Sequence, residues 1–310
     1  MGKRAQSKGA GVVDEDVQLD AAVMSSTTTP GSAARLQSAI CGPISWVATV
    51  KIVVELPDGK TAEFFKKGAS GERGPAMMKG AFGAEQVLYS FLPKHVPKPA
   101  AWGTYCSDPD THFYLCEFVE VYDDLPSAYG WASVVSGLHL NGMGGSPTNR
   151  FGFHITTHLA NVPVDNAWKS SWEALWGQQI KSLFEQERLP HKADEEIERL
   201  KNADLDRAIP RSDLGQAIAN NDQADLAICR NPRYKLGPQF IYEYLKRVPA
   251  SEPAEDFDAR NAVYAMKYHT LLSILYVKYL RFRQILKDEL HALLNNMGEP
   301  PQVVGRDAHL

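Results

Sequence analysis

The sequence predicts an α+β protein of two lobes, in which a small and mostly antiparallel sheet precedes a mainly helical half. The first third of the chain is rich in β-branched residues that turn signals divide into short runs, as expected for strands. From Trp131 onward, apolar residues recur at helical intervals instead. With 310 residues, the chain is long enough to bury the core of two such lobes.

The sheet lobe is predicted from a hairpin, a helix and a later buried strand. VATVKIVVEL at 47–56 and TAEFFKK at 61–67 are separated by PDGK, which is a strong turn signal. A glycine-rich loop then leads into a helix, and VPKPAAWGTY forms an extended link into a strand. THFYLCEFVEV at 111–121 is mostly apolar, which is typical of a strand covered on both faces.

The helical lobe is predicted from a series of amphipathic runs. WASVVSGLHLNG indicates a helix that ends at Gly142, because glycine accepts the left-handed cap conformation. Further helices are expected over 166–189, 194–209, 237–248, 257–277 and 280–298. The expected organisation is therefore a flexible leader at 1–35 with one short helix near Val17–Met24, a sheet lobe at 36–121, a helical lobe at 122–300 and a tail at 301–310.

Composition excludes several classes of function. The net charge is −4 and the basic residues are scattered among acids, which argues against nucleic-acid binding. The most apolar run, Leu271–Leu280, is too short to span a membrane, and no apolar secretory signal follows the first residues. The four cysteines form no C-x-x-C pair, so neither a zinc site nor a disulfide framework is expected. The expected location is therefore the cytoplasm.

Two separate motifs resemble the fructosamine (ketosamine) 3-kinase family. FGFHITTHLANVPVDNAWKSSW at 151–172 is similar to a family segment that reads F-G-F, N-x-P and N-x-W-x-x-x-W. SEPAEDFDARNAVYA at 251–265 resembles the C-terminal stretch of the fungal-type protein-ribulosamine 3-kinases. The resemblance implies a protein-kinase-like fold that uses ATP and Mg²⁺ to phosphorylate the 3-hydroxyl of ketosamines, free or on glycated proteins.

The resemblance places a nucleotide site in the sheet lobe. Lys66 in F-F-K matches the strand lysine that contacts phosphates, and it is favoured over its neighbour Lys67. Ala81 stands where the family has the helix glutamate that holds this lysine. Glu85, one turn later on the same helix face, is the expected substitute.

Two backbone segments complete the expected nucleotide site. The turn of CGPISWVATV matches the family loop that covers the nucleotide, where glycine lets backbone amides approach phosphate. The strand end at 117–119 matches the link whose backbone would bind the adenine edge. The residues assigned in this way are Gly42, Ser45, Trp46, Glu117, Phe118 and Val119.

The substrate side is expected at the best-matched motif. Asn166, Trp168 and Trp172 belong to the family segment beside the sugar. Within the helix predicted over 166–189, the two tryptophans share one face, where aromatic residues usually form core.

The catalytic segment of the family has no full counterpart. Asp213 is the candidate for the catalytic aspartate, although Arg211 replaces the family histidine and Gly215 the family tryptophan. Only 20 positions (233 − 213) separate Asp213 from Arg233, too few for a catalytic loop, two strands and a metal-binding aspartate. The sequence therefore predicts either an internal deletion or an incorrectly spliced sequence, assigns no metal ligand, and favours a polar turn at 220–222.

Three interpretations follow from this mixture. The chain is an active ketosamine kinase, a non-catalytic relative that binds nucleotide or a glycated partner, or a truncated product that folds poorly. A phosphotransferase for another small alcohol, such as choline or an aminoglycoside, shares the broad fold. It is less favoured because both motifs resemble the ketosamine branch.

Overall fold

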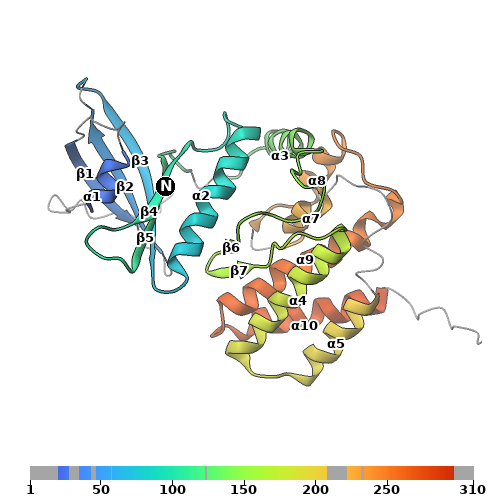
Figure 1. Ribbon diagram of the computed structural model, residues 1–310. Coiled ribbons are helices and arrows are strands. Elements are labelled where there is room, and N and C mark those ends of the chain that lie inside the picture. The colour runs from blue at the N-terminus through green and yellow to red at the C-terminus, as the bar shows by residue number, and fades with distance from the viewer. Residues whose placement is uncertain are drawn as a thin grey trace, which may run out of the picture. The chain divides into compact units, whose positions relative to one another are not determined.

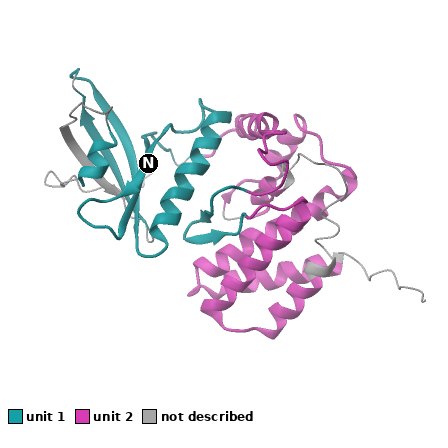
Figure 2. Cartoon of the chain, in the orientation of Figure 1, with its two compact units in different colours: residues 1–124, 153–166 teal, residues 125–152, 167–310 magenta. Residues whose placement is uncertain are grey.

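The computed structural model describes residues 20–27, 35–42, 47–56, 58–122, 124–207, 222–231 and 234–296. They form two compact units (Figures 1 and 2). The sheet unit comprises the described residues up to Asp124 together with Phe153–Asn166. The helical unit comprises Leu125–Gly152 and the described residues from Ala167 onward. The chain thus enters the helical unit, returns to the sheet unit for one short segment, and leaves it again.

The sheet unit is built on five antiparallel strands in the order β1-β2-β3-β5-β4. The strands are Arg35–Gly42 (β1), Ala48–Glu55 (β2), Thr61–Ser70 (β3), Pro99–Thr104 (β4) and Thr111–Glu117 (β5). The predicted hairpin between β2 and β3 is confirmed, and Gly59 supplies the left-handed residue of its turn with φ 78°. The strand predicted over 111–121 ends earlier, at Glu117.

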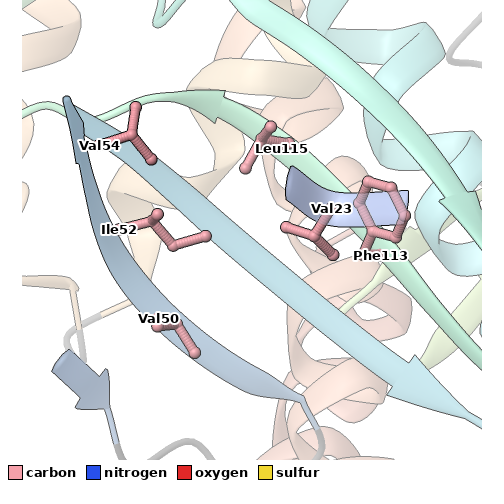
Figure 3. Packing of buried hydrophobic residues seen from close by; sticks show 6 residues of the cluster. All are labelled: Val23, Val50, Ile52, Val54, Phe113 and Leu115. Carbon is pink, nitrogen blue, oxygen red and sulfur yellow. The ribbon is translucent and has the colours of Figure 1, made fainter. Parts of the chain in front are cut away.

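One face of the sheet is covered by helix α1 (Ala21–Ser25). Val23 of this helix is completely buried and lies beside Phe113 of β5 (Figure 3). The rest of this cluster comes from alternate residues of β2 and β5, namely Val50, Ile52, Val54 and Leu115. A short helix was expected near 17–24 within a flexible leader. The structure places a helix at 21–25, and it belongs to the core because Val23 completes this cluster.

Asp20 fastens α1 to the loop between β4 and β5. Its carboxylate accepts hydrogen bonds from the N–H of Ala22 at 2.8 Å and from the N–H groups of Cys106 and Ser107 at 2.9 and 2.8 Å. Burial alone would raise the pKa of Asp20, but these bonds and one from the Ser107 hydroxyl hold it well below its usual value.

The opposite face of the sheet is covered by α2 (Gly74–Phe91), which contacts β3, β4 and β5. Met77 and Met78 pack there against Tyr114 and Cys116 of β5. A second, two-stranded hairpin of β6 (Thr157–Leu159) and β7 (Val162–Val164) packs against α2 as well. These two strands form the segment that returns from the helical unit.

The described helices of the helical unit are α3 (Ala128–Gly142), α4 (Trp172–His191), α5 (Glu195–Arg207), α7 (Asp222–Leu226), η1 (Ala227–Arg230), α8 (Pro238–Leu245), η3 (Ala254–Asp256), α9 (Phe257–Leu275) and α10 (Leu280–Asn296). Six of them lie close to the predicted ranges, whereas α7, η1 and η3 were not predicted. α9 is central and contacts α4, α7, η1 and α10. Four consecutive residues, Val263 to Met266, are buried, which requires neighbours on every side of the helix.

His139 joins three helices of this unit. Its Nε2 lies 3.0 Å from the Asp225 carboxylate of α7, and its Nδ1 lies 2.8 Å from the Tyr244 hydroxyl of α8. None of the helices in the described part of the chain combines the length and the hydropathy needed to cross a membrane.

Candidate functional site

Lys66 and Lys67 are adjacent on β3 and therefore lie on opposite faces of the sheet. Lys66 lies on the α1 face, where its ammonium donates a hydrogen bond to the Tyr105 hydroxyl and sits 5.0 Å from the centre of the Tyr105 ring. Only 5% of Lys66 is exposed, so it is not a solvated lysine at a strand end.

Lys67 lies on the α2 face. Its register partner on β5 is Tyr114, which packs against α2. Burial lowers the pKa of Lys67, and the Glu85 carboxylate on α2 partly offsets this effect. Burial likewise raises the pKa of Glu85, and Lys67 opposes that shift. The structure thus places Glu85 where it acts electrostatically on Lys67, whereas the sequence suggested Lys66, because strand alternation turns Lys66 away from the helix.

The charge of Lys67 is only partly balanced. Across the residues that the structure describes, no carboxylate lies within the 4.0 Å of an ion pair with its ammonium. A half-buried ammonium with a distant counter-charge can gain by binding an anion, and phosphate is such a ligand. The residues present therefore fit a nucleotide phosphate at this position.

Two further basic groups lie on the same side of the sheet. His158 of β6 has a buried Nδ1 without a hydrogen-bond partner among the described residues. Burial, Arg73 and Lys67 together lower the pKa of His158, so its imidazole is neutral at neutral pH. Arg73, at the start of α2, donates to the Asn161 carbonyl at 3.4 Å. The sequence reasoning missed both residues, since only the tertiary fold brings β6 to α2.

The strand end expected to bind adenine is largely engaged within the sheet. The N–H of Glu117 donates to the Lys98 carbonyl at 2.9 Å, and the N–H of Phe118 donates to the Glu63 carbonyl at 3.1 Å. Val119 is half exposed and makes no such bond within the described part of the chain. Gly42 is the last residue of β1, whereas Ser45 and Trp46 lie outside the described residues.

Asn166 serves the β6–β7 hairpin. It is buried, and its side-chain amide donates to the Thr157 hydroxyl at 2.7 Å and to the Ile155 carbonyl at 3.4 Å. Its own carbonyl accepts from the N–H of Phe153 at 2.9 Å. These bonds direct Asn166 into the hairpin rather than toward a ligand.

The two motif tryptophans do not share a helix face, which corrects the sequence interpretation. α4 begins at Trp172, because the Ser171 hydroxyl accepts a hydrogen bond from the N–H of Ala174 at 3.1 Å and caps the helix. Trp168 precedes the helix, and its carbonyl accepts from the Arg150 guanidinium at 3.0 Å. Ser171, followed by an acidic residue in the first turn, was the signal for this helix start.

Trp172 belongs to an aromatic cluster of the helical unit. Its indole N–H donates to the Tyr264 hydroxyl at 2.9 Å, and its ring stacks on Trp176 with centroids 6.2 Å apart. The ring centroids of Phe151 and Trp172 lie 6.4 Å apart. Both sequence motifs therefore meet in one core cluster, since Phe151 and Trp172 belong to the first and Tyr264 to the second.

The catalytic and metal-binding part of the expected site cannot be built from the described residues. Asp213, Arg211 and Gly215 lie outside them, as does most of the segment where a deletion was inferred. Within the described ranges, no group of three or more His, Cys, Asp or Glu side chains could hold a metal ion. The described geometry thus provides a lysine whose position fits a phosphate, but neither the base nor the metal ligands.

Comparisons with known proteins agree with this architecture. The candidate fructosamine-3-kinase from Thermobifida fusca YX-ER1 has a TM-score of 0.67 at 17% identity, covering 90% of this chain and 100% of that chain. A second candidate, from Haemophilus somnus 129PT, has a TM-score of 0.64 at 11% identity, covering 84% and 92%. Aminoglycoside phosphotransferase APH(4)-Ia, in a ternary complex with AMP-PNP and hygromycin B, has a TM-score of 0.55 at 9% identity, covering 86% and 96%.

At these identities the structural likeness concerns the fold, which is protein-kinase-like. No curated protein sequence matches the chain at a significant level. The family model for fructosamine kinase matches residues 22–205, which is more than half of the chain. The chain therefore belongs to the fructosamine kinase family.

Proposed function

We propose that this protein binds ATP on the α2 face of its sheet and phosphorylates the 3-hydroxyl of ketosamines. The observation that carries the proposal is the half-buried Lys67, which faces Glu85 of α2 without contacting it as an ion pair. A lysine on the central strand opposite a helix glutamate is what phosphoryl transfer in this fold requires.

Each described residue has a defined task in this proposal. The Lys67 ammonium binds nucleotide phosphate as a point charge, and Glu85 orients it. The N–H of Val119 meets the adenine edge, because Glu117 and Phe118 already use theirs within the sheet. Lys67 thereby takes the place that the sequence interpretation gave to Lys66.

The substrate and the metal come from the family rather than from the described geometry. Ketosamines, free or on glycated proteins, are the family substrates that the two motifs imply, and ATP supplies the phosphoryl group when bound. Mg²⁺ would need ligands among residues outside the described ranges, where Asp213 is the proposed base. The nucleotide complex of the APH(4)-Ia neighbour supports ATP as the donor.

A second candidate function is nucleotide binding without phosphoryl transfer. The short distance between Asp213 and Arg233, 20 positions (233 − 213), favours it, because a full catalytic and metal-binding segment does not fit there. In this case Lys67 and Glu85 keep their tasks, whereas Asp213 has none.

Two measurements on the purified protein test both candidates. ATP that binds only the folded state raises Tm, by an amount equivalent to about 2.7 kcal/mol at one hundred times Kd. ADP release in the presence of ATP, Mg²⁺ and a fructosyl-amine then reports transfer. A Tm shift with ADP release supports the kinase, a shift without release supports the non-catalytic reading, and no shift contradicts both.

A further inference from the structure

The β6–β7 hairpin docks its backbone into a notch of helix α2. A Cβ atom added to Gly80 would lie 2.3 Å from the Thr156 carbonyl oxygen, a distance that no side chain tolerates. A Cβ atom on Gly83, one turn along the helix, would lie 2.6 Å from the terminal methyl of Ile155. Only the absence of a side chain at Gly80 lets the two backbones come this close.

The hairpin is itself held in one shape. Asn166 bonds to Thr157 and Ile155 across the hairpin, and its carbonyl accepts from the N–H of Phe153. Arg73, at the start of α2, reaches the Asn161 carbonyl in the turn between β6 and β7. The hairpin thus contacts α2 at its start and again at Gly80, so the helix cannot slide along its axis without breaking one contact.

α2 needs such a restraint more than the strands do. Hydrogen-bond ladders to β2 and β5 fix β3, and with it Lys67, whereas α2 meets the sheet through side chains such as Met77 and Met78. Glu85 lies on α2 a turn and a half beyond Gly80. Any shift or rotation of α2 therefore moves the Glu85 carboxylate relative to Lys67.

We propose that Phe153–Asn166 acts as a clamp on α2, which makes Gly80 a positioning residue for the Lys67–Glu85 pair. The inference rests on the proposed function as far as Lys67 is a nucleotide ligand. The clamp itself is a property of the fold. Residues from the family motif thereby act on Lys67 and Glu85 through their contact with α2.

The test compares Gly80→Ala with Gly83→Ala in the full chain. Alanine favours a helix over glycine, so without a clamp both substitutions raise Tm. If the clamp exists, Tm is still expected to rise in Gly83→Ala, because the new methyl group meets only the movable end of the Ile155 side chain. Gly80→Ala meets the Thr156 backbone, so it is expected to lower Tm and to raise the Kd for ATP about tenfold.

Hydrogen exchange gives a readout that does not depend on nucleotide. Gly80→Ala is expected to speed amide exchange in both α2 and 153–166, whereas Gly83→Ala leaves both unchanged. Should Gly80→Ala fail to fold, Thr157→Val loosens the hairpin from within by removing the acceptor of Asn166. It is expected to speed exchange in α2 to a smaller degree.

A double-mutant cycle separates positioning from general destabilisation. If the clamp acts through Glu85, Gly80→Ala changes the Kd for ATP less in a Glu85→Gln background than in the wild type. Additive effects, or unchanged exchange in Gly80→Ala, overturn the proposal. A wild-type protein without any ATP-dependent Tm shift contradicts the proposed function instead, and the exchange comparison still decides on the clamp.

Discussion

The Glu85 carboxylate of α2 acts on Lys67 of β3, while the adjacent Lys66 turns its ammonium to Tyr105 on the other face of the sheet. This relationship follows from the two-residue period of a strand. It separates two neighbouring lysines, of which the sequence resemblance favoured Lys66. One is a buried partner of a tyrosine, and the other is a half-buried cation on the α2 face.

Lys67→Met is expected to abolish the ATP-dependent rise in Tm, because it removes the charge that phosphate would contact. Lys66→Met is the matched control, since it removes the neighbouring ammonium from the opposite face. Its ATP-dependent shift is expected to equal that of the wild type, even if its basal Tm changes. Thermal unfolding with and without ATP measures both. A normal shift in Lys67→Met with a lost shift in Lys66→Met would return the phosphate role to Lys66.

The folded protein is expected to lose stability on mild acidification because of His158. Its pKa lies below the ordinary 6.5 in the folded protein, so below that pH the unfolded chain binds a proton that the folded chain does not. Stability then falls as pH decreases through this window, and His158→Gln is expected to have a shallower decline of Tm. His95→Gln, a substitution at an exposed histidine, should follow the wild type. Parallel curves for all three proteins contradict the assignment.

Much of the architecture could be predicted from local pattern. The PDGK turn between β2 and β3 and the apolar runs of α9 and α10 each carry a strong local signal, and the structure confirms them. The helix start near 166 was wrong because the apolar period continues through Trp168 although the chain there pairs with Phe151 and Arg150 instead. Tertiary contacts overrode periodicity at that point.

The site was less predictable than the fold. The motif F-F-K-K indicates that a lysine is present but not which lysine faces α2, since that depends on the register of β3. His158 of β6 lies 78 positions beyond Gly80 of α2 (158 − 80). The two elements meet only because the chain returns from the helical unit to the sheet unit. No local signal in either segment indicates that contact.

The ionised carboxylate of Asp20 is expected to stabilise the attachment of α1 to the rest of the sheet unit. Its folded pKa lies well below the ordinary value, so it stabilises the folded state above the unfolded pKa of 3.8, and this contribution is lost as pH falls. Asp20→Asn retains a helix cap but cannot accept all the bonds from Ser107 and Cys106. Its Tm is expected to be lower than that of the wild type at neutral pH, and the difference is expected to shrink only as pH falls below 3.8 toward the much lower folded pKa. A constant difference across this range argues against the charge.

Among the substitutions considered in the helical unit, Glu187→Ala is expected to cause the largest loss of stability. The Glu187 side chain is 2% exposed, accepts a hydrogen bond from the Ser273 hydroxyl at 2.9 Å, and lies 3.0 Å from Arg283 Nε. The Arg283 N–H is not aligned with the carboxylate, so the contact is chiefly ionic. Glu187→Ala leaves a mostly buried guanidinium without this partner, which is expected to lower the free energy of unfolding by about 3 kcal/mol.

Glu185→Ala is the matched control for this substitution. Glu185 lies on the same helix with a side chain that is 61% exposed and 4.0 Å from Lys201, and such a surface pair contributes about 1 kcal/mol or less. Glu187→Gln should fall between the two, because it keeps the shape and an oxygen for Ser273 but loses the charge. Urea unfolding followed by tryptophan fluorescence measures all three, since Trp172 and Trp176 lie in this unit. Equal losses in Glu187→Ala and Glu185→Ala would mean that Arg283 finds sufficient compensation from Asp194, whose carboxylate lies 3.9 Å away.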